Sequence, residues 1–144
     1  MRTRQDIESY LLRSNLSFND VGSEADAVDE AMWLVRDHAT GENIVVSMAG
    51  PLLLFRVKVL DLDHVREREP LFQRLLELNA QDMVHGAYGL ADGAVVLTAG
   101  LPLENLDYNE FQAIVDDISM SLDRHLDELS HWLPGGDEAK QGEE

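Results

Sequence analysis

A tight turn at Asp92-Gly93, set between two strand-like runs, is the feature that most restricts how this chain can fold. The runs "VHGAYGL" and "AVVLTAGL" both have the alternation expected of strands. An Asp-Gly pair between such runs favours a two-residue hairpin turn, because glycine and aspartate tolerate the positive φ angles that this turn requires. The sequence therefore predicts two adjacent antiparallel strands within residues 84–101.

The residues before position 61 predict further strands. "LSFNDV" alternates over a short run, "AMWLVRD" and "NIVVSMA" are separated by a glycine-bearing turn, and "LLLFRVKVL" is rich in strand-forming residues. Pro51 precedes the last run and marks a bend or a sheet edge, because proline cannot donate to a strand ladder. The acidic stretch "GSEADAVDE" is predicted to be a loop.

Helices are predicted on either side of these strands. Thr3 can cap a first helix, with Asp6 three residues on and an apolar face that follows. Pro70 suits the first turn of a second helix, where its missing N–H group is not needed, and this helix, "LFQRLLELN", should end at Asn79.

The last helix is predicted to be long and to begin at Asp107. Asp107 and Glu110 have the spacing of a capping box, and Leu106 can pack on Phe111 across the helix start. Its apolar positions recur at intervals of three and four residues: Phe111, Val115, Ile118, Leu122, Leu126, Leu129 and Leu133. The Pro-Gly-Gly sequence at 134–136 should end the helix, and residues 135–144 are expected to form an acidic, disordered tail.

The predicted element order, α-β-β-β-α-β-β-α, corresponds to an α+β domain. We expect an antiparallel sheet of about five strands with the helices packed on one face. A chain of 144 residues suits a single domain, which we place at residues 1–134.

The charge of the chain restricts its partners. Eleven Lys and Arg residues stand against 28 Asp and Glu residues, which gives a net charge of −17. Such a charge repels nucleic acid and anionic lipid, so neither is expected as a partner. The sequence has no cysteine, and its longest apolar run, "MAGPLLLF", is too short to cross a bilayer. We therefore expect a cytoplasmic protein without membrane insertion.

The sequence contains no recognisable catalytic motif. Asp61, Asp63 and His64 could form a metal-binding cluster, but a charged strand exit is the simpler interpretation, because no further ligand has suitable spacing. His125 and His131 lie six residues apart, which does not place them on one helical face as a pair of metal ligands, so both are expected to face solvent or an interface. His85 is interpreted as a half-buried structural residue or as a residue at the sheet edge. No enzyme activity, metal or cofactor is predicted.

A family resemblance rests on the segment from Leu71 to Phe111. "LFQRLLELN", the hairpin with Asp-Gly in its turn, "LPLENL" and the long acidic helix together resemble the C-terminal half of the YbjN family. That family is similar in fold to type III secretion chaperones of the CesT type. In element order the resemblance extends from Ile7 to about Leu133. It implies a non-catalytic, homodimeric module that binds protein, and it supplies no catalytic residue.

A non-catalytic module of this kind would act through its surface. Large apolar residues that could contribute to a partner or dimer surface occur on the second strand, around Pro51 and at the end of the last helix: Met32, Trp33, Leu34, Met48, Phe55, Trp132 and Leu133. Core packing is the competing interpretation for each of them.

Three hypotheses follow from the sequence. The chain is a homodimeric, chaperone-like module that holds a protein partner, or a sensory or regulatory protein of the YbjN type without chaperone activity. The third hypothesis is a small enzyme or metal-binding protein that uses Asp61, Asp63 and His64.

Overall fold

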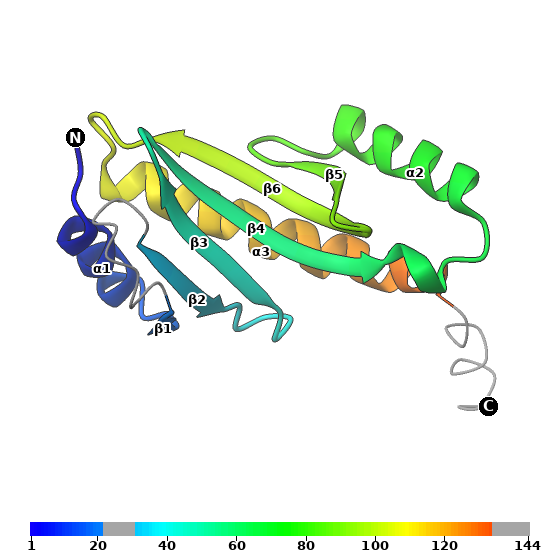
Figure 1. The fold of residues 1–144 in the computed structure, drawn as a ribbon, viewed down its shortest axis with the longest axis horizontal. Coiled ribbons are helices and arrows are strands. Elements are labelled where there is room, and N and C mark those ends of the chain that lie inside the picture. The colour runs from blue at the N-terminus through cyan, green and yellow to red at the C-terminus, as the bar shows by residue number, and fades with distance from the viewer. Residues whose placement is uncertain (22–30, 134–144) are drawn as a thin grey trace.

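The computed structural model of the chain describes residues 1–21 and 31–133, and within them the chain forms three α-helices, one 3₁₀ helix and six strands (Figure 1). In chain order these are α1 (Arg4–Arg13), β1 (Ser17–Asp20), β2 (Met32–Arg36), β3 (Asn43–Ala49), β4 (Leu52–Asp61), η1 (Leu62–His64), α2 (Arg68–Gln81), β5 (Ala87–Ala91), β6 (Ala94–Pro102) and α3 (Tyr108–Ser130). The predicted α+β class is confirmed. The loop predicted within 22–30 and the tail predicted at 135–144 lie outside the described residues.

The strands form one antiparallel sheet in the order β1-β2-β3-β4-β6-β5. The predicted count of about five strands was wrong, because each of the four strand-like runs before α2 forms its own strand, including the four-residue β1. After α2 the chain returns as the β5–β6 hairpin, and β6 pairs with the long strand β4. This return leaves β5 at the edge of the sheet.

The turn that joins β5 to β6 has the predicted geometry. Asp92 and Gly93 have φ angles of 52° and 75°, both in the left-handed region. Positive φ at both central residues is the mark of the type I′ turn, whose twist matches that of the flanking strands. The hairpin is therefore specified locally.

The N-caps predicted at Thr3 and Asp107 are confirmed. Thr3 and Asp6 form a reciprocal capping box, and the hydrogen bonds from the Thr3 backbone and side chain lower the pKa of the Asp6 carboxyl. At α3, the Asp107 side chain accepts a hydrogen bond of 2.8 Å from the backbone N–H of Glu110. Both caps satisfy N–H groups that have no partner within a helix.

The predicted helix ends differ from the structure. α2 continues past Asn79 to Gln81. The Asn79 side chain does not cap the helix, because it accepts from the backbone N–H of Tyr88 at 2.7 Å and donates to the backbone C=O of Tyr88 at 3.0 Å. α3 ends at Ser130 rather than at Leu133. In the turn that follows, backbone N–H groups reach carbonyls three residues back, as the bond from Leu133 to Ser130 shows.

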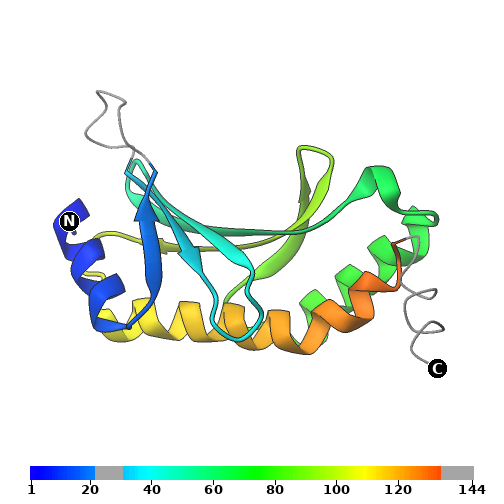
Figure 2. The same cartoon turned by 90° about the horizontal axis from the view of Figure 1, so that it is seen from below.

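The helices lie on one side of the sheet, and the core lies between them and the strands. Figure 2 shows α3 running along one face of the sheet, with α1 near one end of α3 and α2 near the other. At the centre of this layer, the rings of Phe55 from β4 and Phe111 from α3 lie 5.8 Å apart. No helix in the described part of the chain is long and apolar enough to span a membrane.

Candidate functional site

The face of the sheet that points away from α3 is not covered by a helix. In Figure 2 the two ends of the sheet rise away from α3, so this helix-free face is concave. Residues alternate between the faces, since side chains on a strand point to opposite sides in turn. Trp33 is buried on the helix side, whereas its neighbours Met32 and Leu34 are on the helix-free face, where Met32 is 38% exposed.

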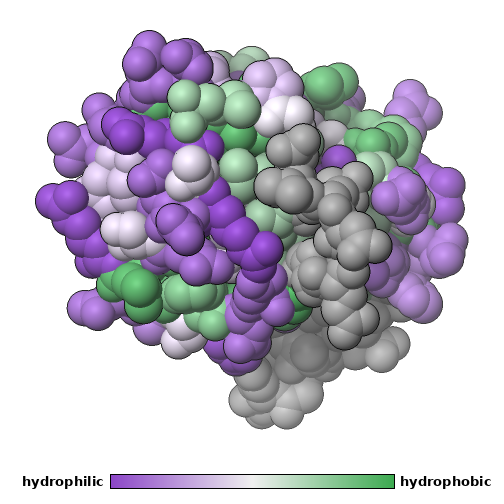
Figure 3. All heavy atoms as spheres, turned by 60° about the vertical axis from the view of Figure 1, so that its left-hand side comes forward, coloured by the Kyte–Doolittle hydropathy of each residue, from purple (hydrophilic) through white to green (hydrophobic). Residues whose placement is uncertain are grey.

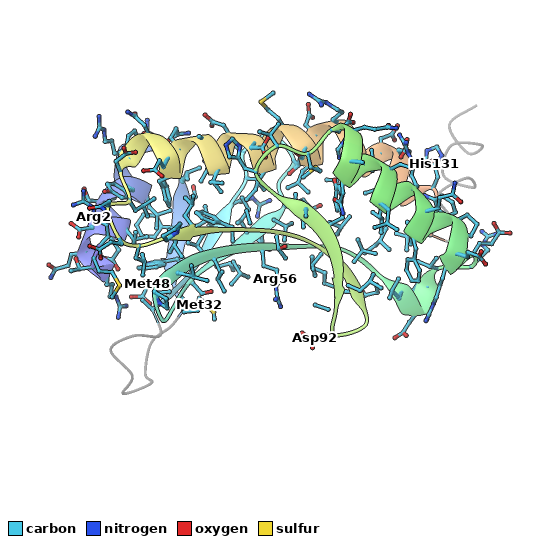
Figure 4. All side chains as sticks on the ribbon, turned by 90° about the horizontal axis from the view of Figure 1, so that it is seen from above. Arg2, Met32, Met48, Arg56, Asp92 and His131 are labelled. Carbon is cyan, nitrogen blue, oxygen red and sulfur yellow. The ribbon has the colours of Figure 1, made fainter. Side chains whose placement is uncertain are left out.

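A groove of about 560 Å³ occupies the centre of this face. We call it the sheet groove, and it is lined by Met32, Val45, Ser47, Leu54, Phe55, Arg56, Thr98, Ala99 and Gly100. In the register of the sheet, Val45, Arg56 and Thr98 form one row across β3, β4 and β6. Figure 4 shows Met32 and Arg56 pointing away from α3, on the open side of the sheet.

Gly100 keeps the sheet groove open. A Cβ atom built on Gly100 would lie 3.3 Å from the Cδ2 atom of Leu54, the nearest side-chain atom of the facing strand. A side chain at position 100 would therefore occupy the space beside Leu54 that is now open.

The basic residues of the face stand out in such an acidic chain. Arg36, Arg56 and Lys58 are all exposed and occupy positions of the helix-free face. Among the strand positions of this face that the structure describes, Asp61 at the end of β4 is the acidic one, and Lys58 pairs with it at 2.7 Å. Within the residues that the structure describes, the strands of this face thus contribute mainly basic charge.

A second apolar groove of about 210 Å³ lies between α2 and the edge strand β5. This α2–β5 groove is lined by Phe72, Leu75, Leu76, Asn79, Tyr88, Gly89 and Leu90. Leu76 is 68% exposed and Leu90 is 53% exposed. Exposed leucines beside a strand that is paired on one side only are a feature of surfaces that receive another chain.

His125 is buried, so the prediction that it faces solvent or an interface was wrong. Its Nδ1 atom lies 2.7 Å from the Tyr88 hydroxyl and its Nε2 atom lies 3.0 Å from a carboxylate oxygen of Asp82. These bonds join α3 to β5 and to the end of α2, and they satisfy both ring nitrogens. The helical period places residue 125 on the core side of α3, between the buried residues Leu122 and Leu129. The charged residues next to His125 in the sequence made a surface position the simpler prediction.

The other histidines are at the surface. His131 lies exposed in the turn after α3. His85 is also exposed and accompanies Asp117, whose carboxylate accepts a hydrogen bond of 3.1 Å from the His85 backbone N–H. Both differ from His125, because each lies outside the layer between the helices and the sheet.

The seven residues proposed for a partner surface are divided by the fold. Trp33 and Phe55 are fully buried in the core, and Met48 is buried beside them. Met32 and Leu34 are on the helix-free face, while Trp132 and Leu133 are half-buried in the turn after α3 and pack on the core from its end. The structure thus separates these residues into a core set and two distant surface sites.

The sequence also contains a signal for the sheet groove. Three consecutive leucines, Leu52 to Leu54, begin β4, so both faces of this strand are apolar at that end. The basic residues Arg56 and Lys58 then follow on the helix-free face at two-residue spacing. Apolar residues followed by basic residues at two-residue spacing on one face of a strand are the pattern that predicts the sheet groove.

The charged strand exit does not assemble a metal site. Asp63 and His64 are exposed in η1, and Asp61 pairs with Lys58. No group of three or more His, Asp or Glu side chains suited to a metal ion occurs in the described ranges.

Other apolar surface is broken into small areas on the side of the molecule nearest α1. Figure 3 shows hydrophobic groups there that are separated by hydrophilic side chains. Isolated exposed apolar residues, such as Leu12 on α1, are ordinary for a folded protein.

Comparison with known proteins identifies the fold and the family. The crystal structure of YbjN from E. coli has a TM-score of 0.57 to this chain at 16% identity, over 85% of this chain and 90% of that one. The structure of the ExsC–ExsE complex has a TM-score of 0.44 at 16% identity, over 88% of this chain and 97% of that one. No curated protein sequence matches the chain. The family model CesT_Tir_1 matches residues 1–133, which is nearly the whole chain, and the protein therefore belongs to this type III secretion chaperone family.

Proposed function

We propose that this protein is a non-catalytic, chaperone-like module that holds a segment of a partner protein on the helix-free face of its sheet. The observation that carries the proposal is the sheet groove, an open and mainly apolar hollow that contains Leu54 and Met32. A partner that covered these side chains would remove apolar area from water, which favours association.

Membership in the CesT_Tir_1 family supports a protein-binding role of the chaperone kind. The likeness to YbjN supports the shared fold. The chemistry of the face agrees with binding rather than catalysis, because apolar and aliphatic side chains predominate around Arg56. The lack of cysteine in the sequence fits a reducing compartment and supports the cytoplasm as the place of action.

We also propose that two copies associate through the α2–β5 groove. Leu76 and Leu90 expose apolar area at the opposite end of the sheet from β1, and β5 has a free edge. A symmetric pair would cover both grooves with the same surface, as isologous dimers do. The sheet groove, which is centred on β3, β4 and β6, would remain open in such a dimer.

Site-specific photo-crosslinking tests the function. A benzoylphenylalanine group in place of Leu54, in cells that naturally make this protein, should form adducts with a partner polypeptide. The same group in place of Met120, which is exposed on α3, is the matched control.

The adducts should depend on an open groove. Gly100→Val should reduce adduct formation from position 54, because its side chain occupies the space beside Leu54. Equal adduct yields from positions 54 and 120 would contradict the proposal. A purely regulatory protein would bind a folded partner, so limited proteolysis of the captured partner distinguishes a held, unfolded segment from a folded domain.

A further inference from the structure

We infer that the segment held in the sheet groove is an amphipathic helix whose apolar stripe contains one carboxylate, and that Arg56 binds this carboxylate. The inference rests on the proposed function and specifies the chemistry of the partner. It follows from the charges of the helix-free face, the positions and contacts of its three basic residues, and the hydrogen bonding of its strands.

The charge of the helix-free face is opposite to that of the chain. The chain has a net charge of −17, yet Arg36, Arg56 and Lys58 lie on this face, and Asp61 is the acidic residue among its described strand positions. A partner that carries a carboxylate thus meets basic side chains here, whereas it would meet mainly acidic ones over the outer surface of α3. Complementary charges of this kind give specificity to an interface.

Arg56 is the basic residue that lines the sheet groove itself. Lys58 is engaged by Asp61, and the Arg36 guanidinium lies over the β2–β3 turn, where its Nη2 atom is 3.5 Å from a Cβ built on Gly41. Arg56 has no hydrogen bond or ion pair with any residue in the described ranges, and it lines the sheet groove. A planar guanidinium bordered by apolar side chains suits a carboxylate, which it can bind through two parallel hydrogen bonds.

The surroundings of Arg56 limit the partner to about one carboxylate. In the register, Val45 and Thr98 lie on either side of Arg56, and the next row contains Ser47, Leu54 and Gly100. A second carboxylate placed over Leu54 would be buried without a cation, which is costly. The partner surface should therefore be apolar around its single acidic residue.

The hydrogen bonding of the sheet favours a helix as the partner element. The strands that form the groove, β2, β3, β4 and β6, are each paired on both sides. An extended peptide laid on this face would find no backbone partners, whereas a helix satisfies its own backbone and offers only side chains.

A designed peptide series tests the inference with the full-length protein. The probe is a fluorescently labelled helical peptide of about 18 residues with a leucine stripe and lysines on its outer face. Its central stripe position is glutamate, glutamine or lysine in three otherwise identical peptides. Fluorescence anisotropy then measures the Kd of each peptide for the wild-type protein, Arg56→Gln, Arg56→Glu and the control Arg124→Glu.

Arg124 is exposed on α3, so Arg124→Glu changes the net charge as Arg56→Glu does but leaves the groove intact. We expect the glutamate peptide to bind wild-type protein about fivefold more tightly than the glutamine peptide, the ratio that corresponds to a partly exposed ion pair. Arg56→Glu should reverse the preference in favour of the lysine peptide, and Arg124→Glu should preserve it.

Different failures have different meanings. If all three peptides bind alike and Gly100→Val weakens each of them, the groove binds helices without selecting a carboxylate; the inference is then overturned while the proposed function stands. If no peptide binds, or Gly100→Val has no effect on binding, the groove is not a helix site and the inference is overturned as well. If Arg56→Glu instead converts a dimer to a monomer, the occupant is a second copy of the chain, which also overturns it.

Discussion

At the scale of single residues, His125 shows how a polar side chain is accommodated between the helices and the sheet. A carboxylate oxygen accepts, so the contact with Asp82 favours the tautomer in which the Nε2 atom of His125 donates to it, and in that tautomer the Nδ1 atom accepts from Tyr88. Burial raises the pKa of the Tyr88 hydroxyl, and the charges of Glu128 and Asp82 raise it further. The hydroxyl therefore keeps the proton that it donates.

Replacing Tyr88 with phenylalanine tests this bond. Tyr88→Phe removes the donor to the His125 Nδ1 atom, which lies in a buried site, and an unsatisfied buried group of this kind costs about 1–3 kcal/mol. The free energy of unfolding in urea should decrease by that amount. Tyr108→Phe is the control, since the Tyr108 residue is only half-buried; its hydroxyl donates to Gln112 within α3 and accepts from the Ser14 hydroxyl at the end of α1. An equal decrease in the free energy of unfolding for the two variants would show that the buried bond contributes no more to stability than the half-buried one.

The α3 cap gives a second prediction at this scale. Asp107→Ala should lower the free energy of unfolding by about 1 kcal/mol, because the N–H group of Glu110 loses its acceptor. Asp107→Asn should recover most of the loss, since asparagine is also a strong N-cap residue. Urea denaturation measures both, with Asn109→Ala as the control. A larger effect at Asn109 would place the start of the helix at that residue.

At the scale of elements, α2 is held against β5 and α3 by specific polar bonds. Asn79 binds the backbone of β5, and Arg74 binds Glu128 of α3 through two hydrogen bonds of 2.8 and 2.9 Å. The hydrogen bonds from Arg74 lower the pKa of the Glu128 carboxyl. A carboxyl with a lowered pKa stabilises the fold above its unfolded-state pKa of 4.5, and this contribution is lost as the pH falls through the lower, folded-state pKa.

The lowered pKa of Glu128 leads to a pH-dependent prediction. Glu128→Gln should reduce the free energy of unfolding at neutral pH by up to about 1 kcal/mol, the range of exposed ion pairs, because Glu128 is 46% exposed. The difference from the wild-type protein should shrink below pH 4.5 as Glu128 gains a proton. Asp123→Asn, at an exposed position of the same helix, controls for the general loss of negative charge. A difference that stays constant between pH 7 and pH 3 would contradict the ion-pair assignment.

At the scale of the whole molecule, the sheet has two open surfaces with different characters. The sheet groove contains an available cation, whereas the α2–β5 groove is almost entirely apolar and borders a free strand edge. We assign the first to a partner segment and the second to a second copy of the chain. The large negative charge elsewhere then disfavours other contacts between copies, because like charges repel.

Light scattering tests the assignment of the dimer. The wild-type protein should have twice the chain mass of 16.1 kDa at micromolar concentration, and Leu76→Asp should yield the monomer mass because a carboxylate would be buried in the contact. Met120→Asp, on the exposed side of α3, should remain dimeric. A monomeric wild-type protein would refute the homodimer.

The sequence by itself determined those features that depend on neighbouring residues. The Asp92-Gly93 turn, the caps at Thr3 and Asp107 and the antiparallel strands all follow from the stereochemistry of short segments. The positions of the strand runs were also set locally, although their total was undercounted. Family membership agrees with the resemblance seen between Leu71 and Phe111.

The tertiary structure alone decided which residues are available. Alternation places Trp33 and Leu34 on opposite faces of β2, but it does not state which face α3 will cover. That choice depends on contacts between residues far apart in the chain, such as Phe55 with Phe111 and Tyr88 with His125. The packing of α3 on the sheet leaves Trp33 and His125 buried and Met32 and Arg56 on the open face, so the same apolar pattern supplies both the core and an exposed surface.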